Sequence, residues 1–165
     1  MFNIQGNTDK FMKFDLMVGA MTWEQSAALA RSLQAEGFSG MLFTETGQTP
    51  WMSIAAAATA APQLDFSTGI AVAFPRSPMI TAIAAWDLQK MSGGRFELGL
   101  GTQIKPNIEQ RYSARWDPPV PQLREYVQAM KAVFHSFQTG ERLNFVGEHY
   151  SLTKLQPFFN PGPID

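Results

Sequence analysis

Residues 64–103 read LDFSTGIAVAFPRSPMITAIAAWDLQKMSGGRFELGLGTQ, and this stretch decides the fold. Its first run, residues 64–74, is apolar and β-branched with little polar interruption, which is typical of a strand buried on both faces. Ser77 suits the N-cap of a following helix and Pro78 its first position, and the Ser-Gly-Gly after the helix supplies a stop. A second apolar run follows over 96–100. The pattern predicts two parallel strands joined by a crossover helix.

The helix between these two strands is expected to bury one apolar face. The members of that face recur at the spacing of a helix that packs on a core. They are Ile80, Ile83, Ala84, Asp87, Leu88 and Met91. Trp86 in this helix, like Trp23 in an earlier one, is expected to contribute packing rather than to stack on a ligand.

The rest of the chain repeats the alternation of strand and helix. Thr22 and Gln25 have the spacing of a capping box, so a helix is predicted over 22–36. The other predicted elements are strands over 13–19 and 39–46, a helix over 51–61, an irregular connection from 104 to about 121, a helix over 123–137 and a small hairpin near Gly147. Alternating strands and helices imply a parallel sheet. The βα units are either half of a (β/α)8 barrel, which needs roughly 250 residues, or a small open sheet with a reversal in strand order.

Composition and charge exclude several classes of protein. The chain has 165 residues with 13 basic and 14 acidic side chains, so no nucleic-acid-binding stripe or charged tail is expected. It contains no cysteine, which excludes disulfides and thiolate metal sites. The polar N-terminus lacks the apolar segment of a signal peptide, and no apolar run is long enough for a membrane span. We therefore expect a soluble, cytoplasmic protein, with residues 1–11 as an extension and residues 12–165 as one domain.

Glycines lie at the ends of both strands of the decisive stretch. In parallel α/β folds, ligands bind at the carboxyl ends of the strands, and Gly69, Gly99 and Gly101 fall there. Two explanations are open: a flat ligand lies against bare backbone, or the glycines only relieve crowding between strands. The Leu-Gly-Leu-Gly of residues 98–101 is not a dinucleotide-binding fingerprint, because no third glycine follows at the required spacing.

Several motifs resemble those of one known superfamily. They are TGIAVAFPRSP at 68–78, LQKMSGGRF at 88–96 and LGLGTQ at 98–103, with support from EYV at 125–127 and FVGEHY at 145–150. From about residue 13 to its end, the chain resembles the luciferase-like monooxygenase superfamily, and within it the oxidoreductases that depend on the deazaflavin coenzyme F420. The resemblance implies an α/β fold of the TIM (β/α)8 barrel type, of which this chain contains the first four βα units, a half barrel.

The resemblance also implies a binding site. The ring of F420, or alternatively of FMN, would lie at the C-terminal face of the barrel, in front of a bulge formed by a non-prolyl cis peptide between Gly69 and Ile70. The residues assigned to cofactor binding are Thr44, Gly69, Ile70, Ala71, Gly99, Gly101, Thr102 and Gln103. No metal is implied, and His135 and His149 are expected to be structural.

Glu45, at the end of the second predicted strand, is the candidate catalytic residue. Relatives often place an acid or a histidine there, near the reactive edge of the ring. A carboxylate enclosed in an apolar cavity keeps its proton to higher pH, which suits proton transfer near neutrality. The alternative is an exposed glutamate in the loop between a strand and a helix, and the sequence does not separate the two.

Three functions follow from the resemblance. The first is hydride transfer between F420 and an unknown organic small molecule, because this coenzyme carries hydride and reacts poorly with oxygen. The second is an FMN-dependent monooxygenase, and the third is a non-catalytic, truncated flavin-binding half barrel. Typical relatives are about twice as long, and the loops expected to bind the cofactor phosphate fall in the half that this chain lacks. A half barrel exposes unpaired strand edges, so we also expect a homo-oligomer.

Overall fold

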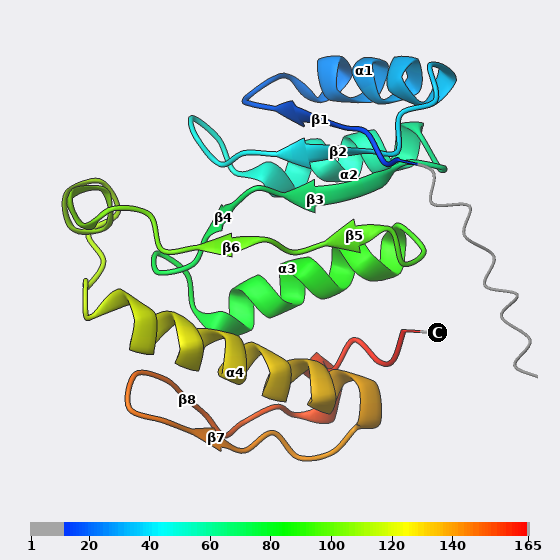
Figure 1. Ribbon diagram of the computed structural model, residues 1–165. Helices are drawn as coiled ribbons and strands as arrows, with labels where there is room; N and C mark the ends of the chain where they lie inside the picture. The colour runs from blue at the N-terminus through cyan, green and yellow to red at the C-terminus, as the bar shows by residue number, and fades with distance from the viewer. Residues whose placement is uncertain (1–11, 165) are drawn as a thin grey trace, which may run out of the picture.

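The computed structural model describes residues 12–164, and its strands and helices alternate along the chain (Figure 1). The strands are β1 (Asp15–Val18), β2 (Gly40–Phe43), β3 (Asp65–Thr68), β4 (Ala71–Val72), β5 (Phe96–Glu97), β6 (Leu100–Gly101), β7 (Phe145–Val146) and β8 (Ser151–Leu152). The helices are α1 (Trp23–Ala35), α2 (Pro50–Ala60), α3 (Pro78–Met91) and α4 (Pro119–Thr139), with a π-helical turn at Asn107–Arg111 and a 3-10 turn at Pro157–Phe159. The expected extension, residues 1–11, lies outside the described residues. None of the described helices is long and apolar enough to cross a membrane.

A parallel sheet forms the centre of the molecule. Its strands are hydrogen-bonded in the order β1-β2-β3-β5, which is also their order along the chain, so the reversal required by the open-sheet alternative is not present in this sheet. The two long strands predicted from the sequence are each interrupted, and their second parts, β4 and β6, pair in parallel with each other (Figure 1). Between β3 and β4 the Gly69–Ile70 peptide bond is cis, which confirms that expectation.

The helices cover one face of this sheet. One row of side chains across the strands packs with residues of α1, α2 and α3 in a single core. This row is Leu16, Met41, Phe66 and Phe96. The alternate residues point to the other face, because side chains alternate along a strand. Among residues 12–164, nothing buries Met17, Asp65 and Glu97 on that second face, which we call the open face.

The caps predicted for two helices are present. Thr22 and Gln25 form a reciprocal capping box at the start of α1, and the Ser77 side chain accepts a hydrogen bond from the N–H of Ile80 at the start of α3. Trp23, the first residue of α1, is 61% exposed, so its predicted packing role is wrong. A cap places the start of a helix, but it does not decide which side chains face the core.

The buried face predicted for α3 is mostly wrong, and Leu88 is the one residue of the predicted six that is buried. Ile80, Ile83 and Met91 are exposed. The residues that α3 buries are Pro78, Thr81, Ala82, Ala85, Trp86 and Leu88. The helix is packed from two sides, by the sheet and by α4, where Trp86 stacks on Phe134 with ring centroids 5.6 Å apart. Small residues in α3 allow both close contacts. A pattern built on large aliphatic residues does not detect such a buried face.

Arg95 ties α2 to the strand that begins one residue later. Its guanidinium donates hydrogen bonds to the carbonyl oxygens of Ala61 at 3.3 Å and of Leu64. It also reaches the carbonyl of Ala58 at 3.5 Å and lies 5.5 Å from the ring centroid of Phe66. The last carbonyls of a helix lack partners within the helix, so Arg95 satisfies groups that α2 cannot satisfy itself.

The hairpin predicted near Gly147 is present as β7 and β8, and a carboxylate on α4 holds it in place. Glu125 accepts hydrogen bonds from the N–H groups of Glu148 (3.0 Å), His149 (2.8 Å) and Tyr150 (2.7 Å). Desolvation raises the pKa of Glu125, but the three hydrogen bonds outweigh it and hold that pKa below its usual value.

Replacing Glu125 by Gln should lower the free energy of unfolding at pH 7 by about 2 kcal/mol, because the hydrogen bonds lose their charged acceptor. The folded pKa lies below the ordinary value of 4.5. The carboxylate therefore stabilises the fold fully above that value, and this stabilisation is lost as the pH falls through the lowered pKa. Urea unfolding at pH 7 and at about pH 3 should show a smaller difference between wild type and variant at the lower pH.

The matched control is Glu141→Gln, at an exposed position, which should change stability by less than about 0.5 kcal/mol. A difference between Glu125→Gln and wild type that does not change with pH would contradict the role assigned to the carboxylate.

The connection between β6 and α4 is more ordered than predicted. It contains the π-helical turn at Asn107–Arg111, and α4 begins at Pro119 rather than near residue 123. Proline is favourable in the first turn of a helix, where its missing N–H would have no partner. The run of prolines before residue 122 therefore starts α4 instead of delaying it.

Candidate active site

The carboxyl ends of β4 and β6 lie side by side at the edge where ligands bind in parallel α/β folds. The N–H of Ala71 donates to the carbonyl of Gly99 at 2.8 Å, and the N–H of Ala73 donates to the carbonyl of Gly101 at 2.9 Å. These bonds join residues 69–71 and 99–101 into one continuous piece of backbone, which we call the strand-end strip. The strip brings together Gly69, Ile70, Ala71, Gly99 and Gly101.

Other atoms of the chain occupy the space where a side chain at the strip glycines would lie. A Cβ on Gly99 would fall far inside contact distance of the Thr68 carbonyl oxygen, and a Cβ on Gly69 would collide with the Leu42 side chain. A Cβ on Gly101 would lie 2.8 Å from Ile70 Cδ1. Of the two explanations that the sequence left open, relief of crowding is the one that the geometry supports.

Glu45 is buried in an ion pair beside the strip. Its side chain is 4% exposed, and its carboxylate faces the Arg76 guanidinium, with one hydrogen bond of 2.8 Å from Nη1 to Oε2 and a second from Nη2 to Oε1. Oε2 also accepts the N–H of Val72 at 2.7 Å. The exposed-loop alternative is therefore wrong. This carboxylate also does not lie in the apolar cavity that would suit proton transfer.

Arg76 is the residue of this edge that the sequence analysis missed. It donates to the carbonyl of Val72 at 2.7 Å and lies 5.8 Å from the ring centroid of Trp51. The pair with Glu45 thus joins the end of β2 to the end of β4. The sequence did contain a signal for this ion pair, because a glutamate and an arginine each follow a buried strand. The ends of neighbouring parallel strands meet at one edge of a sheet.

The other residues predicted to bind the cofactor differ in their burial and in their contacts. Ala71 is buried, and the Thr44 hydroxyl donates to the carbonyl of Val18 at 3.1 Å. Thr102 lines a groove along α4, so it faces away from the open face. Gln103 has a φ of 62° and accepts the N–H of Ile104 with its side-chain oxygen. Thr102, the residue next to the strip, therefore lies toward α4, and Gln103 after it has a backbone conformation that non-glycine residues rarely adopt.

The two histidines lie away from the strand-end strip. His135 is exposed and pairs with Glu141 at 3.0 Å. His149 Nδ1 lies 3.6 Å from Asp117 Oδ2, in a cavity of about 360 Å³ that Tyr150 also lines. Within the described part of the chain, no group of three or more histidine, aspartate or glutamate side chains could hold a metal ion.

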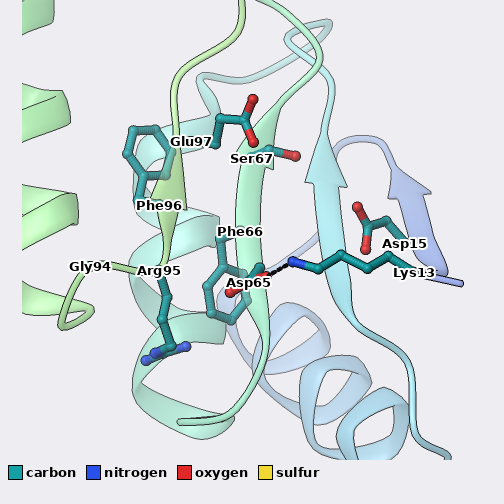
Figure 2. Close-up of a pocket in the computed structure, with 9 residues that line it drawn as sticks. All are labelled: Lys13, Asp15, Asp65, Phe66, Ser67, Gly94, Arg95, Phe96 and Glu97. Atoms are coloured by element: carbon teal, nitrogen blue, oxygen red, sulfur yellow. Dashed lines mark hydrogen bonds and ion pairs between the residues drawn. The ribbon is translucent and has the colours of Figure 1, made fainter. Parts of the chain in front are cut away.

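A second polar cluster lies at the opposite, amino-terminal end of the open face. Figure 2 shows Lys13 reaching across β2 to Asp65, and the Nζ–Oδ2 distance is 3.0 Å. Asp15 and Glu97 also line this cavity, which has a volume of about 340 Å³. Nearby carboxylates, Asp65 first, raise the pKa of Lys13. In parallel α/β folds ligands bind at the other end of the strands, so we assign no chemistry to this cluster.

Comparison with known proteins identifies the family. The sequence model of the luciferase-like monooxygenases matches residues 10–165. This chain belongs to the luciferase-like monooxygenase family. The resemblance inferred from the motifs is thereby confirmed.

Two curated relatives of this family member come from Mycobacterium tuberculosis. Rv1360, an uncharacterized protein, is 42% identical over 139 residues, which make up 84% of this chain and 41% of Rv1360. Rv3520c, a putative coenzyme F420-dependent oxidoreductase, is 27% identical over 145 residues, which make up 86% of this chain and 41% of Rv3520c. The chain thus spans less than half of the length of these relatives.

Solved structures share the fold of this luciferase-like chain. An F420-dependent secondary alcohol dehydrogenase in complex with an F420-acetone adduct aligns with a TM-score of 0.76 and 19% identity, covering 93% of this chain and 49% of that one. The oxygenating constituent of 3,6-diketocamphane monooxygenase from Pseudomonas putida, in complex with FMN, aligns with a TM-score of 0.75 and 16% identity, covering 92% and 46%. The α/β fold is therefore that of luciferase-like enzymes, whose members include F420-dependent and FMN-binding proteins.

Proposed function

We propose that this chain carries part of the active site of an oxidoreductase that transfers hydride between coenzyme F420 and an organic small molecule. The observation that carries the proposal is the strand-end strip, which lies at the carboxyl ends of two neighbouring strands beside the open face. A relative named as a putative F420-dependent oxidoreductase and a structure that holds an F420 adduct support F420 as the cofactor.

In this proposal, one face of a flat aromatic ring would lie on the surface beside the strip. The room next to its glycines is filled by the side chains of Leu42 and Ile70, so the local surface is apolar. The charges of Glu45 and Arg76 neutralise each other beside it. A flat, uncharged surface of backbone and aliphatic carbon suits the face of a ring better than it suits a phosphate or a metal ion.

Within this proposal the residues of the chain position the ring, and bound F420 supplies the hydride donor or acceptor. Ile70 would contact the ring face, and the positive φ of Gln103 turns the chain after the strip. Glu45 acts as a positioning residue, because its carboxylate holds both Arg76 and the N–H of Val72. The catalytic role of Glu45 stays a prediction, since both of its oxygens are already occupied.

We also infer that the βα units form half of a (β/α)8 barrel. The sequential strand order and the burial of a single face of the sheet support this architecture. In that setting the open face lines the interior of the barrel. The loops that would bind the phosphate of the cofactor are expected outside residues 12–164.

The experiment is a pair of fluorescence titrations of the purified chain, one with F420 and one with FMN. We expect F420 to bind with the lower dissociation constant, and Ile70→Ala to raise that constant by about tenfold through lost apolar contact. Ile83→Ala, the same substitution at an exposed position on α3, is the matched control and should leave binding unchanged. Circular dichroism checks that both variants fold.

The other outcomes of these titrations have defined meanings. Preferential binding of FMN would replace the proposal with the second candidate, an FMN-dependent monooxygenase, which the FMN complex of similar fold favours. Binding of neither cofactor would contradict the proposal that this chain holds the ring.

A further inference from the structure

The segment that follows β6 crosses the carboxyl end of the sheet. In the strand order β3 lies between β2 and β5, and β4 and β6 follow β3 and β5 along the chain. Arg111, in the π-helical turn after β6, nevertheless donates a hydrogen bond of 2.7 Å to the carbonyl of Thr46, in the loop after β2. The segment therefore reaches past the end of β4, and Figure 1 shows its π-helical turn beyond the ends of β4 and β6. We call residues 104–113 the cap segment.

We propose that the cap segment is an openable cover of the strand-end strip, and that Arg111 is its latch. Arg111 is thus a positioning residue, because it acts through the loop after β2 and is assigned no contact with the ring. The inference rests on the proposed function for what lies beneath the cover, namely the ring of the cofactor. It goes beyond that function by naming the residue that controls entry and release.

The cap segment is attached to the rest of the chain by few contacts. Ile108 is its one buried side chain, and it packs in the core that also contains Val72 and Tyr126. The N–H of Ala114 donates to the carbonyl of Ile108 at 3.0 Å, which fixes the same point. Residues 109–111 are exposed. A segment with little buried apolar contact opens more readily than the core of a protein.

The backbone at both ends of the cap segment has a conformation that non-glycine residues rarely adopt. Gln103, just before the segment, has a φ of 62°, and Ser113, its last residue, has a φ of 51°. Such conformations persist only where surrounding contacts hold them, and they are frequent in segments that switch between two arrangements. The closed cap thus holds two residues in strained conformations, and opening it releases them.

The loop on the other side of the latch is fixed. Glu45, just before Thr46, is buried in its ion pair. Gln48, two residues after Thr46, donates from Nε2 to the carbonyl of Met21 at 2.8 Å and to the hydroxyl of Ser53 at 3.1 Å. Thr46 therefore lies between two anchored residues. The cap segment is the partner that moves.

The contact between Arg111 and Thr46 suits a reversible latch. It joins a guanidinium to a neutral carbonyl, and both residues are exposed. The guanidinium also lies 5.2 Å from the ring centroid of Tyr112, which limits the motion of this long side chain. An exposed hydrogen bond contributes little net free energy, so it breaks and forms again without unfolding of the protein.

The first test is hydrogen exchange on the full 165-residue chain without any ligand. Arg111→Ala should increase the exchange rate of the Ala114 amide by about fivefold, because the closed cap loses one hydrogen bond. The amides of α1 should keep their rates, and Arg111→Lys, which retains a donor, should give an intermediate result. Lys105→Ala is the matched control, since this cation of the cap pairs with Glu109 rather than with the loop.

The second test follows the binding of F420 by stopped-flow fluorescence. The latch is closed both with and without the cofactor, so its loss eases passage in both directions. Arg111→Ala should raise the association and dissociation rate constants by about fivefold each and leave their ratio nearly unchanged. A residue that contacts the cofactor would change mainly the dissociation rate constant.

The results of the two tests decide the proposal. An unchanged exchange rate at Ala114 in Arg111→Ala would overturn the latch, and an equal rise in α1 would indicate a general loss of stability instead. A rise in the dissociation rate constant alone would make Arg111 a contact residue, contrary to the proposal. If neither F420 nor FMN binds, the proposed function fails, and the exchange at Ala114 still decides whether Arg111 latches the cap.

Discussion

Replacing Arg76 by Ala should lower the free energy of unfolding by about 3–5 kcal/mol, because it leaves the carboxylate of Glu45 buried without its partner. The Glu45 side chain is 4% exposed and that of Arg76 is 17% exposed, so water cannot replace the guanidinium without opening the structure. Urea unfolding at neutral pH and one protein concentration measures the difference. The double variant Glu45→Gln/Arg76→Ala should recover part of the loss, since no charge then stays buried.

Two further substitutions make this experiment specific. Arg76→Lys keeps the positive charge but not the two-armed hydrogen bonding, so it should fall between wild type and Arg76→Ala. Arg115→Ala removes an arginine that also pairs with a carboxylate, but its side chain is 84% exposed, and the loss should stay below about 1 kcal/mol. Equal effects of Arg76→Ala and Arg115→Ala would contradict the view that burial makes the Glu45 pair important.

Gly99→Ala should lower the free energy of unfolding by more than about 3 kcal/mol. The added Cβ would collide with the backbone carbonyl oxygen of Thr68, and this backbone cannot easily move away. The Thr68 hydroxyl donates to the carbonyl of Gly99 at 2.8 Å and accepts the N–H of Gly99 at 2.9 Å. Thermal unfolding of the variant should show the loss directly.

The control for this prediction is Gly47→Ala, where the nearest atom to a new Cβ, on Ala20, lies 4.0 Å away. It should change the free energy of unfolding by less than about 1 kcal/mol. A stable Gly99→Ala variant would contradict the crowding explanation for the glycines. It would also reopen the view that they leave space for a ligand.

The local signals in the sequence predicted most of the secondary structure. Thr22 and Ser77 cap helices where expected, because capping depends on a few neighbouring residues. The face of α3 was missed because α4, distant in sequence, decides which side of the helix is buried. The interruption of the strand at residues 69–70 was expected only from the resemblance to a family, since apolar runs carry no signal of a break.

The candidate site was predictable in position but not in detail. Strand ends in a parallel sheet meet at one edge, and the structure places Glu45 and the strand-end glycines near one another there. The partner of Glu45 was not predicted, because Arg76 lies 31 residues away along the chain and only the fold brings the two together. The cofactor-binding role of Thr102 stays a prediction, and the groove along α4 that this residue lines was not expected from the sequence.

Arg95 has a consequence for how this chain comes apart. Its backbone leads into β5, its guanidinium binds the carbonyls that end α2, and it rests on the ring of Phe66 in β3. One side chain therefore joins successive βα repeats to one another. Unfolding of one repeat therefore removes contacts that the next repeat requires. The repeats are thus expected to melt as a single cooperative unit, and a piece cut between α2 and β5 would lack a group needed to complete its last helix.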